Sequence, residues 1–376
     1  MKKTIYKYFF YEFLRLFAIV LFALVAIIWT IQAVNYLDLV TDDGHAFSIY
    51  IFYSSLTIPK IFTKLIPYAF LIASIFTILK FEKDNELIIL WTSGLNKIHI
   101  VNLIFRISIV IMFLQFLMST TINPQSLNFS RTLLKNSQLQ FVPSLLKEKK
   151  FNDTVEGLTI FVDKKKESGI YENIFIRDDG KILTQVSGGS STIFARSGYL
   201  SKTEDSLILL NGNIQTIEND NKINIINFDK TVLNLSGLST KTISETKIQE
   251  TSTLQILQCM QNSSLILNNC KRGDNQDEIK ELRIELNKRF GMPIFIPLVS
   301  LIVCFLLSGR RERKISKYNT YVYGIIGLIA LVASEITVRY SGLSLNHTII
   351  YYLVPISFLP IIYLFLIRVF KYENLN

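Results

Sequence analysis

The chain has 376 residues, of which 49% are hydrophobic and 19% charged, and its mean hydropathy is +0.33. This balance excludes an ordinary soluble protein and indicates a membrane protein with a substantial polar part. The net charge of +10 does not indicate nucleic-acid binding, because the largest polar stretch, 123–289, is nearly neutral, with 22 Lys and Arg against 20 Asp and Glu.

Six apolar segments are each near the ~20 residues that cross a bilayer as a helix. They are 16–37, 59–79, 100–122, 291–307, 318–338 and 349–367. The predicted fold is a polytopic α-helical membrane protein with six transmembrane helices, three before and three after a large insertion. A signal peptide is the alternative for the first segment, but that segment is long for one and no Ala-x-Ala cleavage site follows.

Basic residues beside the segments predict the orientation. Fourteen Lys and Arg lie at alternate segment ends, which include both termini, whereas the two short opposite loops carry only Arg339. Because basic loops remain in the cytoplasm, we expect both termini and the 80–97 loop on that side. The insertion then lies on the outer side of the membrane.

In the insertion, apolar residues recur at every second position, a period that is typical of β-strands. Its predicted strands are 157–163, 172–177, 181–186, 192–200, 206–211, 213–217, 222–228 and 230–235. Turn sequences such as Asn211-Gly212 separate them. Their spacing predicts an all-β sandwich or jelly roll at about 150–240, with 277–289 as the clearest flanking helix. The expected domains are therefore 1–122, 123–290 and 291–376.

Motifs of catalysis are absent from the sequence. It contains no phosphate-binding G-x-x-x-x-G-K-[ST] loop, no G-x-S-x-G and no H-E-x-x-H, and its three histidines fall in two compartments, so we expect neither a catalytic nor a metal site. Cys304 is expected to be a buried free thiol in the fourth span. Cys259 and Cys270 form a candidate disulfide, although spacing alone does not place them within reach.

The loop after the second segment carries a predicted short amphipathic helix at 82–96. It begins with charge, including Glu86, then places Leu87, Leu90 and Trp91 at helical spacing, and ends at Gly94. Two interpretations remain open. The helix is either a docking element for a cytoplasmic partner or an interfacial helix that lies on lipid.

Two patches resemble the LptF/LptG family, the permease subunits of the lipopolysaccharide exporter. The stretch from Ile66-Pro67 through Glu86-Leu87 to Ser93-Gly94-Leu95 resembles the family's second-span proline and coupling helix. The string Glu285-Leu286-Asn287-Lys288-Arg289 resembles the family's entry into the fourth span. This string is more similar to LptF, whereas Ile58-Pro59-Lys60 is more similar to LptG, and the balance favours LptF.

The resemblance implies a heterodimer with a paralogous six-span permease, bound to a cytoplasmic ABC ATPase dimer that holds the ATP and magnesium. This chain would be the transport path and carry no cofactor. It would take lipopolysaccharide from the outer leaflet of the bacterial inner membrane and pass it through a periplasmic jelly roll to a protein bridge. Glu86, Leu87, Leu90, Trp91 and Gly94 would couple it to the ATPase.

Polar residues near the outer ends of the first, second and fifth spans are candidates for the lipid path. They are Gln32, Asn35, Lys60, Lys64, Glu335 and Arg339. The first two stand where family members carry basic residues. Lys60 and Lys64 lie four residues apart, on one helical face, where they either meet lipid phosphates or extend to the headgroups. Glu335 and Arg339 have the same spacing and are expected to neutralise one another.

Two other functions fit a six-span chain with an outer domain. A permease of a lipoprotein-releasing or macrolide exporter also has a separate ATPase, but that class places one span before its outer domain, whereas three segments precede 123 here. A membrane scaffold or sensor that binds a periplasmic partner without transport predicts no ATPase. Co-purification of an ATPase and a second six-span subunit distinguishes these functions.

Overall fold

The structure of the chain is a computed structural model. It describes residues 2–41, 46–136, 146, 148–155, 157–166, 169–179, 190–201, 206–217, 223–234, 247–261, 276–308 and 313–373. The chain forms two compact units. The helical unit comprises Met1–Ile31, Thr57–Asn128 and Lys247–Asn376, and the sheet unit comprises Gln32–Leu56 and Phe129–Thr246.

Helices precede and follow the strands along the chain. Before the strands they are α1 (Lys2–Asn35), α2 (Asp38–Thr41), α3 (Phe47–Leu56), α4 (Ile58–Lys83), α5 (Glu86–Thr92), α6 (Lys97–Leu117), the π-helix η1 (Met118–Ile122) and α7 (Asn123–Asn136). After the strands they are η3 (Ile248–Glu250), α10 (Thr253–Gln261), α11 (Gln276–Gly291), η4 (Met292–Ile294), α12 (Phe295–Cys304), η5 (Phe305–Ser308), α13 (Arg313–Ser341) and α14 (Leu345–Glu373).

Six helical stretches are long and apolar enough to cross a membrane. They are Thr4–Thr41, Phe47–Lys83, Lys97–Leu134, Ile279–Ser308, Thr320–Ser341 and Leu345–Lys371. All six overlap the apolar segments predicted from the sequence, so the prediction of six spans in a 3+3 arrangement is confirmed.

Helix α12 lies at the centre of the helical unit. Every residue from Phe295 to Cys304 is buried, and the helix contacts α4, α6, α13 and α14. A helix that is apolar on all sides is stable only when other helices surround it, which explains its uniformly hydrophobic sequence. Cys304 is a free buried thiol there, as predicted.

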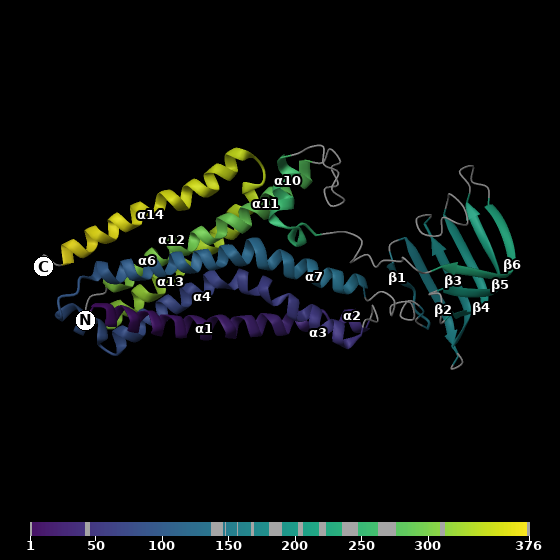
Figure 1. Ribbon diagram of the computed structural model, residues 1–376, viewed down its shortest axis with the longest axis horizontal. Coiled ribbons are helices and arrows are strands. Elements are labelled where there is room, and N and C mark those ends of the chain that lie inside the picture. The colour runs from purple at the N-terminus through teal and green to yellow at the C-terminus, as the bar shows by residue number, and fades with distance from the viewer. Residues whose placement is uncertain are drawn as a thin grey trace. The chain divides into compact units, whose positions relative to one another are not determined.

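The described strands form one antiparallel sheet of six strands (Figure 1). They are β1 (Asn152–Val155), β2 (Leu158–Lys165), β3 (Ile170–Asp178), β4 (Ser191–Leu200), β5 (Ser206–Ile217) and β6 (Ile223–Asn234). The predicted inserted all-β domain is therefore confirmed. Its connectivity is simpler than the expected jelly roll, because in the described residues each strand pairs with its neighbours in sequence. The predicted strand at 181–186 lies outside the described residues.

Residues with a positive φ interrupt the regular alternation of β3 and β5, and one of them lies where the sequence predicted a turn. The expected hairpin at Asn211-Gly212 is wrong, because β5 continues through it. Asn211 does adopt a positive φ, of 51°, and Asn173 in β3 has a φ of 52°. In β3 the buried face passes from Tyr171 to Ile174, three residues apart instead of two. The left-handed residue shifts the alternation of the strand without reversing the chain. The predicted break between 228 and 230 is likewise absent from β6.

Candidate functional site

Helix α5 lies between the second and third spans and is shorter than the predicted 82–96: α4 continues to Lys83, so α5 begins only at Glu86, and it ends at Thr92, just before the predicted Gly94. Asn85 precedes it with a φ of 58°, and Gly94 follows it with a φ of 83°. A positive φ after the last helical turn is the usual conformation at a glycine that ends a helix. The short predicted helix and its terminating glycine are therefore present.

The side chains of α5 face differently from the prediction. Leu87 and Leu90 are 6% and 9% exposed and belong to the core of the helical unit, so they are not an open docking face. Ile88 and Ile89, at 45% and 63% exposed, form the accessible apolar surface. Trp91 packs against the core, with the Lys97 ammonium 5.9 Å from its ring. An amphipathic pattern identifies an apolar face but not the partner that covers it.

Polar contacts connect α5 to the first span. The Tyr8 hydroxyl donates a hydrogen bond of 3.1 Å to Glu86 Oε1. One helical turn further along α1, the carboxylate of Glu12, which is only 7% exposed, forms an ion pair with Lys80 of α4. Two contacts on the same face of α1 therefore connect α1 with α4 and α5.

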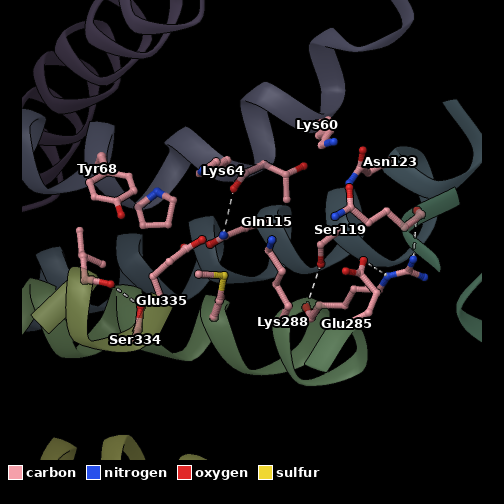
Figure 2. A pocket seen from close by; sticks show the side chains of 16 residues that line it. Lys60, Lys64, Tyr68, Gln115, Ser119, Asn123, Glu285, Lys288, Ser334 and Glu335 are labelled. Carbon is pink, nitrogen blue, oxygen red and sulfur yellow. Dashed lines mark hydrogen bonds and ion pairs between the residues drawn. The ribbon is translucent and has the colours of Figure 1, made fainter. Parts of the chain in front are cut away.

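A cavity of about 90 Å³ lies in the helical unit, between α4, α6, α11 and α13 (Figure 2). Its lining residues are Lys60, Thr63, Lys64, Pro67, Tyr68, Gln115, Ser119, Asn123, Gln249, Glu285, Lys288, Arg289, Met292, Leu331, Ser334 and Glu335. Asn123 and Gln249 lie close in sequence to where the chain leaves for the strands and returns from them. The cavity is therefore at the insertion end of the spans.

Pro67 explains how one wall of the cavity is built. Proline has no amide hydrogen, so the carbonyl of Thr63, four residues earlier in α4, receives no helical hydrogen bond. The Gln115 side chain supplies the missing donor, with Nε2 lying 3.1 Å from Thr63 O. This bond fixes the amide of Gln115, which is 3% exposed, and its Oε1 has no hydrogen-bond partner among the residues that the structure describes. The buried Oδ1 of Asn123 likewise has no partner in the described part of the chain.

Cations outnumber carboxylates in the cavity, with four basic side chains against two acidic ones. Arg289 is fully engaged, since its Nε donates to Glu285 Oε1 at 3.0 Å. For Lys60, Lys64 and Lys288 the structure records no hydrogen bond or ion pair with any residue of the described ranges. Figure 2 shows Lys288 and Glu335 pointing toward Gln115.

This set of groups fits an anion that also carries hydroxyls. Ammonium groups stabilise a phosphate or carboxylate, and the two unpartnered amide oxygens accept hydrogen bonds from hydroxyl donors. A buried polar atom without a partner costs about 1–3 kcal/mol, which a ligand or a water molecule recovers by donating to it. The arrangement therefore favours binding of a phosphorylated or acidic sugar over binding of a purely apolar molecule.

The remaining predicted residues have other positions. Glu335 lines the cavity but Arg339 is exposed and does not, and the structure records no ion pair between these two described residues, so their neutralisation stays a prediction. Gln32 is half-buried, Asn35 is exposed, and neither lines the cavity. Cys259 is disulfide-bonded. Its expected partner, Cys270, lies outside the described residues.

Sequence reasoning missed several of the cavity's residues. Gln115, Asn123 and Lys288 come from segments that were interpreted as a span, a connector and a motif, and no local pattern places them together. One signal in the sequence could have identified Gln115. A proline inside a span leaves a carbonyl that needs a donor, so a glutamine in a neighbouring span is a candidate partner.

Comparison with known proteins agrees with this architecture. The model of the lipopolysaccharide export system permease LptF/LptG family matches residues 7–369. The chain is also 28% identical over 243 residues to Uncharacterized protein RP871 of Rickettsia prowazekii (strain Madrid E), a match that covers 64% of this chain and 66% of that protein, just under two thirds of its length. The family match extends over nearly the whole chain, through both sets of spans and the strands between them. The chain therefore belongs to the LptF/LptG family of lipopolysaccharide export permeases.

Proposed function

We propose that this chain is the transport-path subunit of an ABC-type exporter that takes lipopolysaccharide from the outer leaflet of the inner membrane. The observation that carries the proposal is the cavity, which is lined in a chain of this family by three lysines and two amide oxygens for which the structure records no partner within the described ranges. Lipopolysaccharide presents both phosphates and sugar hydroxyls, which match those groups. The chain functions with a paralogous six-span permease, and ATP and magnesium bind to a separate ATPase.

The orientation follows from charge. Both termini and α5 are cytoplasmic, and the strands are periplasmic, because the basic residues cluster at the α5 side of the spans. The cavity, at the insertion end, then lies near the outer leaflet. Lipopolysaccharide that enters it from the side is close to the segments that lead into and out of the strands.

Helix α5 is the ATPase-contacting element. Its exposed Ile88 and Ile89 offer apolar contact area, and Glu86 offers a charge beside them. The exchange Glu86→Lys is expected to uncouple ATP hydrolysis from export, since it reverses the charge at the contact. The matched exchange Tyr8→Phe removes the hydrogen bond to Glu86 but keeps the carboxylate, so coupling is retained. Equal effects of the two exchanges assign Glu86 to internal packing instead.

The sheet passes lipid to a periplasmic bridge protein. Strands β1 and β6 are the edges of the described sheet, and an edge strand offers unpaired amides to an extended partner strand. Photo-crosslinkers placed along β1 and β6 are expected to capture a periplasmic neighbour in cells. A blank at every position removes this step from the proposal.

Co-purification tests the proposal as a whole. The tagged chain, extracted from native membranes in mild detergent, is expected to bring down a second six-span subunit and a cytoplasmic ATPase, and lipopolysaccharide is expected to stimulate the ATPase of this complex. Purification of the chain without an ATPase overturns the proposal and favours a scaffold or sensor. A complex whose ATPase responds to lipoprotein but not to lipopolysaccharide indicates a different exporter.

A further inference from the structure

The segment Lys247–Gln261, here called the return connector, leads from the strands back to the fourth span. It contains η3 and α10 and belongs to the helical unit. One of its residues, Gln249, lines the cavity. The connector is therefore the part of the chain that both touches the candidate ligand site and continues into the sheet.

Arg289 of α11 holds the return connector. Its side chain is 3% exposed, and Nη1 donates to Thr253 Oγ1 at 2.9 Å, while Nη2 donates to the carbonyl of Gln249 at 3.2 Å. The Nε donates to Glu285, which keeps the guanidinium paired and in the correct plane. The planar fork of arginine makes these bonds in different directions at once, which the ammonium of lysine does not reproduce.

Thr253 extends this contact to the third span. Its hydroxyl accepts from Arg289 and donates to the carbonyl of Thr120 at 2.7 Å. Pro124, four residues later, has no amide hydrogen with which to give that carbonyl an α-helical bond. The same proline explains why the helix widens into the π-helix η1 just before it. One hydroxyl thus joins α11, the return connector and η1, and Ser119 of η1 also donates to the Arg289 carbonyl at 2.8 Å.

We infer that Arg289 and Thr253 form a latch that holds the return connector against the cavity and couples ligand binding there to the connector. The inference rests on the proposed function of the cavity and adds a way in which ligand binding at that site is regulated. Neighbours of the latch that line the cavity include Lys288, which precedes Arg289 in the chain, and Gln249, whose carbonyl accepts from Arg289. Arg289 is a positioning residue, since each of its three nitrogens already donates a hydrogen bond within the chain. By linkage, a ligand that is bound more tightly when the latch is closed also stabilises the closed latch.

Hydrogen exchange of the intact purified complex tests the latch. Thr253→Val keeps the side-chain shape and removes both hydrogen bonds, whereas Thr253→Ser keeps the hydroxyl. We expect Thr253→Val to raise exchange in 247–261 at least tenfold while α14 is unchanged, and Thr253→Ser to resemble the parent. Lipopolysaccharide is expected to slow exchange in 247–261 of the parent, and to bind about tenfold more weakly to the Thr253→Val complex.

The outcomes separate this inference from the proposed function. If Thr253→Val leaves exchange in 247–261 at the parental rate without ligand, the latch does not exist, whatever binds in the cavity. If the connector loosens but the affinity for lipopolysaccharide is unchanged, the latch is structural and the coupling is wrong. If lipopolysaccharide does not bind the parent complex, the proposed function itself fails, while the ligand-free comparison still tests the latch.

Discussion

Removal of the two lysines on α4 tests the chemistry of the cavity. A hydrogen bond to a charged group contributes about 1.5–3 kcal/mol when buried, and an exposed ion pair contributes about 0.2–1 kcal/mol. Lys60 and Lys64 line the cavity but remain exposed in the isolated chain, so solvent screens them and we take about 1 kcal/mol for each contact. Lys60→Gln or Lys64→Gln alone should then weaken lipopolysaccharide binding about fivefold, and the double variant about thirtyfold.

The assay is binding of fluorescent lipopolysaccharide to the purified complex at several salt concentrations, together with ATPase stimulation. The double variant should need more lipid for half-maximal stimulation while its basal hydrolysis stays normal. Arg339→Gln is the matched control, because it removes a charge from an exposed position outside the cavity. Parental affinity in the double variant, or an equal loss in the Arg339→Gln control, refutes the assignment of the lysines as lipid contacts.

Three further predictions concern the fold and the ATPase contact. Gly212→Ala should destabilise the sheet by about 1–3 kcal/mol, because the new Cβ would lie 2.1 Å from the Phe194 carbonyl oxygen, and faster proteolysis within the strands of the full chain checks this. Asn287→Leu should lower the melting temperature of the complex, since it removes buried hydrogen bonds between the fourth, fifth and sixth spans at a cost of about 1–3 kcal/mol per atom left unpaired, and an unchanged melting curve contradicts it. Ile89→Asp should weaken ATPase binding in a folded chain, whereas Leu87→Asp should impair folding itself, as pull-down and size-exclusion profiles of the two variants will distinguish.

The large elements of the fold are predictable because their signals are local. A span needs about 20 apolar residues, and the six that were found all overlap observed helices. Strand periodicity is also local and located five of the six described strands. The positive φ at Asn211 shows the limit of such local signals, since a left-handed residue is compatible both with a hairpin turn and with an irregularity inside a continuous strand. Only the pairing of β5 with both its neighbours distinguishes them.

The site was less predictable because it depends on contacts between distant segments. Lys60, Lys64 and Glu335 were chosen for depth and charge, and all three do line the cavity. Arg339 was paired with Glu335 by its spacing of four residues, yet it is exposed and does not line the cavity. Leu87 and Leu90 were assigned to the ATPase contact from the family resemblance, since their amphipathic pattern left the covering partner open, and the chain's own helices bury both side chains.

The central claim is that lipopolysaccharide enters the cavity of this chain, and site-specific crosslinking tests it most directly. Tyr68 is half-buried and lines the cavity, so a photoreactive phenylalanine analogue at this position samples the space without removing a charge. In native membranes the analogue should form adducts with lipopolysaccharide that decline when ATP drives export, while the same analogue at exposed Tyr340, which does not line the cavity, should form far fewer. Equal labelling at both positions, or none at Tyr68 in a complex that exports normally, contradicts the account.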